Sequence, residues 1–155
     1  MVMIEKASIS HLKQILDVIN KSNKEAYKKI IPKEHFKDPV LSLDRLLEDF
    51  DKMDFYVYLY GGKVVGVAAL HVLEEDVGRI RWVYVLPEFQ RRGIGTALVT
   101  YVENQAEKLG LKKLWLLVVG KAYWATNFYE KLGYRITKRI ERPWGYDLIM
   151  EKRIG

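Results

Sequence analysis

The residues best suited to bind a ligand lie in a short loop between an apolar strand and a helix. Gly93 and Gly95 stand where the helical pattern begins, and two arginines precede them. A helix that begins after such a loop points several free backbone N–H groups at one spot, with the positive end of its dipole behind them. Glycine lets a ligand approach the backbone closely, and arginine adds charge at the rim. We therefore predict that phosphate oxygens bind the backbone of Arg91, Arg92, Gly93, Ile94, Gly95 and Thr96.

Two common phosphate-binding patterns do not fit this loop. A nucleotide P-loop ends in Gly-Lys followed by Ser or Thr, whereas this chain continues from Gly95 into Thr96 and Ala97. A dinucleotide fingerprint needs a third small residue where Leu98 stands, and an acidic residue where the next strand ends in two valines, at 118–119. The plain alternative is an ordinary strand-to-helix turn that binds nothing.

A third pattern fits both the loop and a later segment. Residues 83–95 read VYVLPEFQRRGIG, and residues 127–134 read NFYEKLGY. The first closely resembles the acetyl-CoA signature of the GNAT superfamily of N-acetyltransferases, Arg/Gln-x-x-Gly-x-Gly/Ala after a strand. The second resembles that family's Phe-Tyr-Glu-Lys-Leu-Gly-Phe/Tyr segment, and the two stand in the family's order and spacing, from Gln90 to Tyr129. The similarity extends over about residues 4–153.

The resemblance implies an N-acetyltransferase that passes the acetyl group of acetyl-CoA to a primary amine, by direct attack in a ternary complex. It implies that strands near 79–86 and 114–119 are parallel and splay apart to form a slot. The pantetheine arm of the cofactor would enter this slot and hydrogen-bond the backbone of Val83 and Val85. Gln90 would be among the cofactor-binding residues. A backbone N–H near Val85 would stabilise the oxyanion. Tyr129 would stabilise or protonate the departing CoA thiolate. Without the resemblance, Tyr129 reads as a core residue of its helix.

The chain departs from the family pattern at three places. Ala122 stands where many relatives carry an asparagine that contacts the cofactor. Leu117 stands where some relatives carry a glutamate as general base, and Arg79 and Arg81 stand where others carry the base. We expect these two arginines to be solvated. If they lined the slot instead, they would repel a cationic acceptor. A module that binds acetyl-CoA without turnover is therefore the alternative function.

Composition and charge exclude several other classes of function and partner. The net charge is +6, but Lys and Arg are dispersed, so we expect a solvated surface rather than a nucleic-acid site. The chain has no cysteine, its three histidines lack metal-ligand spacing, and we expect no metal. No apolar run is long enough to span a membrane, and charges at Glu5 and Lys6 argue against a signal peptide, so we expect a cytoplasmic protein without membrane partners. The acceptor would be a small-molecule or peptide amine. The composition favours a thermophilic source. The sequence does not determine the oligomeric state, and a homodimer is possible.

The surrounding elements follow from periodicity and turn residues. Amphipathic helices are expected after Ser8 and from near Ser42, the second with Leu43, Leu46, Leu47 and Phe50 on one face. Strands are expected at about 55–60, 63–73, 79–86, 114–119, 134–139 and 146–153, with a short one before Ser8, and helices at about 95–109 and 123–132. We predict a mixed α/β (α+β) fold of the GNAT type: a mostly antiparallel sheet of about six to seven strands, splayed between strands 4 and 5, with helices on both faces. One domain should cover residues 1–155.

Overall fold

A mixed sheet of seven strands organises the computed structural model, which describes residues 3–155. In chain order the strands are β1 (Ile4–Lys6), β2 (Asp54–Tyr60), β3 (Lys63–Val72), β4 (Val77–Val85), β5 (Lys113–Val119), β6 (Arg135–Arg142) and β7 (Gly145–Arg153). The strands lie side by side in the order β1-β2-β3-β4-β5-β7-β6. β4 and β5 are parallel, and the other neighbours are antiparallel. The predicted mostly antiparallel sheet is confirmed.

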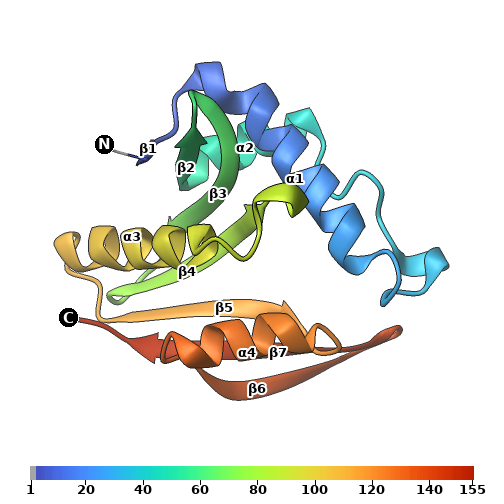
Figure 1. Cartoon of the computed structure of the whole chain (residues 1–155). Coiled ribbons are helices and arrows are strands. Elements are labelled where there is room, and N and C mark those ends of the chain that lie inside the picture. Colours follow the sequence, from blue (N-terminus) through green and yellow to red (C-terminus); the bar gives the residue numbers. More distant parts are fainter. Residues whose placement is uncertain (1–2) are drawn as a thin grey trace.

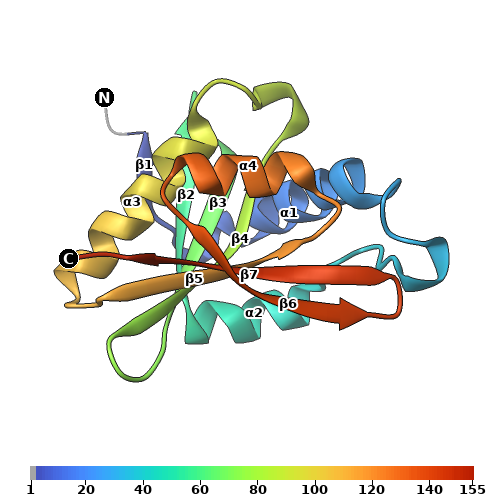
Figure 2. The ribbon, with the colours of Figure 1, turned by 90° about the horizontal axis from the view of Figure 1, so that it is seen from below.

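Helices cover both faces of the sheet, as predicted. α1 (Leu12–Tyr27) packs on β3 and β4, and α2 (Leu43–Lys52) packs beside it. α3 (Ile94–Lys108) packs on β2, β3 and β4 from the opposite face, and α4 (Tyr123–Lys131) lies against β5. Figure 2 shows α2 on one side of the strands and α3 and α4 on the other. In the described residues, no helix has the length and apolar character needed to cross a membrane.

Two details near the N-terminal helices differ from the sequence-based expectation. Ser8 lies at an N-cap position, but of a short 3-10 turn, Ile9–His11, and α1 begins only at Leu12. In α2, Leu46 is buried whereas Leu43 and Leu47 are exposed by 45% and 43%, so the expected four-residue apolar face is wrong. Asp49 is buried on this helix instead, because it has partners for both of its oxygens.

β4 contains a bulge that strand alternation did not predict. Ala69 pairs with Arg81 and Val67 pairs with Tyr84, so Trp82 and Val83 together oppose one residue of β3. Trp82 adopts a φ of 55°, which is unusual for a bulky residue. The bulge places Arg81 and Trp82 on the same face of the sheet, the one that α1 and α2 cover, and Tyr84 follows on that face.

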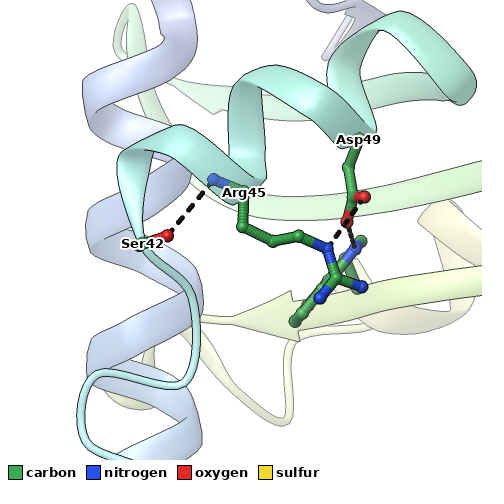
Figure 3. Close-up of polar contacts among 4 residues, drawn as sticks. Ser42, Arg45 and Asp49 are labelled. Carbon is green, nitrogen blue, oxygen red and sulfur yellow. Dashed lines mark hydrogen bonds and ion pairs between the residues drawn. The ribbon is translucent and has the colours of Figure 1, made fainter.

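Asp49 of α2 holds the bulge in place by a hydrogen bond from Trp82. One carboxylate oxygen accepts a hydrogen bond from the indole Nε1–H of Trp82 at 2.9 Å, and the other accepts one from Nε–H of Arg45 at 3.1 Å. Figure 3 shows Asp49 and Arg45 meeting across one turn of the helix, which Ser42 caps by accepting the Arg45 backbone N–H at 3.2 Å. The carboxylate therefore links the start of α2, its last turn and the irregular part of β4.

Replacement of Asp49 by alanine is expected to lower the free energy of unfolding by about 2–3 kcal/mol, because it leaves the Trp82 indole N–H and the Arg45 guanidinium without their acceptor. Urea denaturation measures the loss. Asp51→Ala is the matched control, since Asp51 is exposed on the same helix. A loss below about 0.5 kcal/mol for Asp49→Ala would mean that the carboxylate does not hold the bulge in place.

Candidate active site

The parallel pair β4–β5 is joined only at its beginning. Pairing runs from Val77 opposite Lys113 to Arg79 opposite Trp115 and then stops, although both strands continue. Figure 1 shows the two strands starting together and diverging towards their C-terminal ends. The predicted splay is thus confirmed. A cleft of about 850 Å³ occupies the gap, and its lining comes from both strands, from α1, from the start of α3 and from α4.

At one end, the glycine loop and the start of α3 line the cleft. Arg91 and Gly93 both have positive φ, 63° and 78°, with Arg92 between them. The first helical hydrogen bond of α3 is donated by the N–H of Ala97 to the C=O of Gly93, at 3.0 Å. From Arg91 to Thr96, no backbone N–H donates to an acceptor within residues 3–155. A row of free N–H groups at a helix N-terminus, in a loop of alternating φ sign, is suited to bind an anion.

The predicted loop residues do not all face the cleft. Gln90, Arg91, Gly93, Ile94, Gly95 and Thr96 line it, whereas Arg92 is outside the lining and stacks on Phe89, with its guanidinium carbon 5.0 Å from the ring centre. The Gln90 side chain turns back and donates from Nε2 to the C=O of Val85 at 3.0 Å. Gly95 has a packing reason to be glycine, because an added Cβ would lie 3.3 Å from Phe128 of α4.

Backbone groups of β4 and β5 line the two sides of the slot. The N–H of Leu86 donates to Val65 of β3 at 2.9 Å, so by alternation the backbone groups of Val83 and Val85 point away from β3, into the slot. The N–H of Gly120 donates to Tyr146 at 2.9 Å, and the same alternation turns the backbone of Leu117 and Val119 towards the slot. An extended ligand with amide groups could therefore hydrogen-bond as an added strand.

Tyr129 of α4 both packs in the core and lines the cleft. Its ring contacts those of Phe128 and Tyr134, with centres 4.9 and 5.7 Å away, and only 8% of the residue is exposed. Its hydroxyl makes no hydrogen bond within the described part of the chain. Burial raises the pKa of Tyr129, and nearby Tyr27 raises it further. The phenol is therefore neutral across the ordinary pH range and free to donate a hydrogen bond into the cleft.

Sequence reasoning missed the wall that α1 contributes. Asn23 and Tyr27 line the cleft, and the hydroxyl of Tyr84 donates to Oδ1 of Asn23 at 2.9 Å. Burial raises the pKa of Tyr84, and Tyr27 and Tyr129 add to the effect. A signal was present in the sequence: Ser22 and Asn23 continue the buried stripe of α1 by helical spacing, and both are buried although polar.

The positions where relatives carry a base face the cleft but supply none. Leu117, Arg79 and Arg81 all line it. The expectation that the two arginines are solvated is wrong, because the bulge and the adjoining strands half-bury them; burial, followed by the charge of Arg81, lowers the pKa of Arg79 to about 10. Ala122 is fully buried at the start of α4 and does not line the cleft. Within residues 3–155, no three His, Cys, Asp or Glu side chains gather as a metal site would require.

Comparison with known proteins gives concordant matches. The family model described as "Acetyltransferase (GNAT) family" matches residues 16–134. The chain is 35% identical over 112 residues to an uncharacterized N-acetyltransferase of Methanocaldococcus jannaschii, covering 67% of this chain and 47% of that protein. It is 39% identical over 80 residues to an amino-acid acetyltransferase of Mycobacterium tuberculosis, covering 51% and 46%. These matches span about half the length of either relative.

Solved structures show the same fold. The crystal structure of the PaiA N-acetyltransferase from Thermoplasma acidophilum, in complex with coenzyme A, superposes with a TM-score of 0.85 at 23% identity, covering 99% of both chains.

Proposed function

Because the chain belongs to the acetyltransferase (GNAT) family, we propose that it is an acetyl-CoA-dependent N-acetyltransferase. The observation that carries this proposal is the continuity of one cleft, from the free N–H groups of residues 91–96, past the splayed strands, to the hydroxyl of Tyr129. A CoA thioester has a pyrophosphate, an extended arm with amide groups, and a reacting sulfur. The cleft offers each of them a suitable partner in the same order.

Each group has a defined task in this proposal. The N–H groups of the loop bind the pyrophosphate, and Arg91 adds positive charge beside them. Val83 and Val85 hydrogen-bond the arm through their backbone; because Gln90 already occupies the C=O of Val85, that residue contributes its N–H. The same N–H, near the thioester carbonyl, stabilises the oxyanion. Tyr129 donates a hydrogen bond to the sulfur as the C–S bond breaks.

The acceptor is proposed to be a small-molecule or peptide amine. The neutral amine attacks the thioester carbon, an N–C bond forms, the C–S bond breaks, and the amine's second proton passes to solvent. The Mycobacterium tuberculosis relative, an amino-acid acetyltransferase, supports this class of acceptor. A single domain over residues 1–155, a cytoplasmic location without membrane or nucleic-acid partners, and a homodimer remain proposals from the sequence.

Thiol release in the presence of an amine panel tests acetyl transfer. We expect acceptor-dependent release of free CoA, with the acetylated amine found by mass spectrometry, and calorimetric binding of acetyl-CoA without any acceptor. Tight binding of acetyl-CoA with no release for any amine would favour the alternative of a non-catalytic acetyl-CoA-binding module. Absence of both binding and release would contradict the proposal itself.

The pH dependence of kcat/KM should follow the pKa of the acceptor's amine. With no carboxylate on the base positions, the rate should rise tenfold per pH unit below the amine pKa and level off above it, near 8 for a peptide α-amine. The raised pKa of Tyr129 and of its neighbours Tyr27, Tyr84 and Tyr134 keeps these phenols neutral through pH 9, so no descending limb is expected there. A plateau already reached at about pH 6–7 would reveal an enzyme base.

A further inference from the structure

The cleft continues beyond the slot onto the face of the sheet that α1 and α2 cover. Leu117 and Val119 of β5 alternate with the buried Leu116 and Val118, so they face this side, as does Trp115. The β4 bulge turns Arg81 and Trp82 towards the same face, and Tyr27 of α1 also lines the cleft there. We call this part of the cleft the acceptor pocket; it is lined by Tyr27, Arg79, Arg81, Trp82, Leu117 and Val119, and it is continuous with the part lined by the glycine loop.

Arg79 lies in the acceptor pocket without an anionic partner. Its guanidinium carbon stands 4.6 Å from the ring centre of Trp115, and its Nε is buried without a hydrogen-bond acceptor among residues 3–155. No carboxylate of the described chain forms an ion pair with it. A half-buried guanidinium has lost much of its hydration, and a bound carboxylate would replace the lost water with two parallel hydrogen bonds from the two terminal Nη groups, which are not enclosed as Nε is.

The neighbouring charges do not satisfy Arg79. Arg81 stands close enough that its charge helps to lower the pKa of Arg79. Asp49 lies near Arg81, but its oxygens are already bonded to Arg45 and Trp82. Glu25, an acidic residue of the lining, is exposed at the mouth. The carboxylate of Asp147, close enough to Tyr27 to raise its pKa, is paired with Arg142. The acceptor pocket is therefore positive around Arg79 and Arg81, beside the apolar side chains of Leu117 and Val119.

We propose that the acceptor is a small amine that carries a carboxylate, as an amino acid does, and that Arg79 binds this carboxylate. This inference rests on the proposed acetyl transfer. A polyamine would bring only positive charge to a positive pocket, whereas the carboxylate of an amino acid offsets its ammonium.

Carboxylate binding by Arg79 would also assist the chemistry. In a free amino acid, the negative carboxylate favours the protonated form of the neighbouring amine. When a guanidinium neutralises the carboxylate, the amine loses its proton more readily, and the attacking neutral form becomes more abundant. This effect suits a site that has Leu117 and two arginines where relatives carry a base.

Matched acceptors test the role of Arg79. Leucine and leucinamide, or phenylalanine and phenylalaninamide, share the amine and side chain, and the amide contains more neutral amine at pH 7.5. We expect kcat/KM at least tenfold higher for the free amino acid despite this handicap. Arg79→Met should lower that value at least tenfold while changing the carboxamide value less than threefold, and Arg79→Lys should recover part of the loss. Arg135→Met on the exposed β6 is the control and should change neither value.

A binding measurement keeps the test independent of turnover. Calorimetry on the CoA-loaded protein should give at least tenfold tighter binding of N-acetylleucine than of N-acetylleucinamide, and Arg79→Met should remove the difference. Thermal melting checks the fold of each variant, with Arg79→Gln as a second substitution if the methionine variant melts early. Equal effects on acid and amide, or no preference in the wild type, would overturn the carboxylate assignment while leaving acetyl transfer intact. Arg79-dependent binding without CoA release from any acceptor would instead overturn the proposed function.

Discussion

Replacement of Tyr129 by phenylalanine is expected to lower kcat about 100-fold while leaving acetyl-CoA affinity within about twofold. The substitution removes only the hydroxyl of this cleft-lining residue, which has no hydrogen-bond partner among the described residues. The phenylalanine ring keeps the contacts with Phe128 and Tyr134. The loss should therefore fall on the step in which the C–S bond breaks, because only then does negative charge develop on the sulfur.

The raised pKa of Tyr129 indicates how its hydroxyl acts. A thiol has a pKa near 8.5, so full proton transfer from an ordinary tyrosine near 10 is uphill by about 2 kcal/mol. Burial and Tyr27 raise the pKa of Tyr129 above the ordinary value, which makes complete transfer still less favourable. A hydrogen bond that strengthens as the thiolate forms has no such cost. We therefore expect Tyr129 to act as a hydrogen-bond donor, with the thiolate protonated later by solvent.

Stopped assays for free thiol and calorimetry for acetyl-CoA separate the two expected effects of Tyr129→Phe. Tyr123→Phe is the control, since Tyr123 is on the same helix and 66% exposed. Urea denaturation should give nearly equal stability for both variants and the wild type. If kcat of Tyr129→Phe stays within threefold of the wild type, the tyrosine is a packing residue only, and another group must stabilise the thiolate.

The parts of this site that sequence could predict are those determined locally. The glycine loop, the start of α3 and the stop at Gly110 depend on residues that are neighbours in the chain, so periodicity and turn chemistry locate them within one or two residues. The two family-like segments then gave the parallel order of β4 and β5 and their splay. The loop and the helix boundaries agree with the structure because each is encoded in a short stretch, whereas the parallel pair, which joins residues 77–79 to 113–115, was predictable only through the family resemblance.

The parts that sequence could not predict depend on contacts between distant segments. Asp49 looks like a surface residue of an amphipathic helix, and only Trp82, on another element, explains its burial. Strict alternation along β4 would place Arg79 and Arg81 on the face opposite Trp82. The bulge at Trp82 breaks this alternation and brings them to the same face. Asn23 reaches the cleft only because α1 packs across β4, where Tyr84 donates to it. Strand alternation and helical spacing carry no information about such pairings.

Replacement of Gly93 by valine is expected to weaken acetyl-CoA binding by ten- to 100-fold, about 1.4 to 2.7 kcal/mol. Gly93 has a φ of 78°, a conformation that strains any residue with a Cβ and a β-branched one most of all. No protein atom lies within 4 Å of an added Cβ, so the side chain would project into open space beside the loop. Relief of the strain would turn the free N–H groups of residues 91–96 away from a common centre, and each charge-assisted hydrogen bond lost to a phosphate accounts for about 1.5–3 kcal/mol.

Gly110→Val provides the matched control for this effect. Gly110, at the other end of α3, has a φ of 81° and likewise no protein atom within 4 Å of an added Cβ. Both variants should therefore lose similar stability, about 1–3 kcal/mol by urea denaturation, but only Gly93→Val should lose acetyl-CoA affinity in calorimetry. Equal affinity for the two variants would mean that the loop does not bind the pyrophosphate. Loss of affinity by Gly93→Val alone would assign pyrophosphate binding to this loop, because backbone strain is common to both variants.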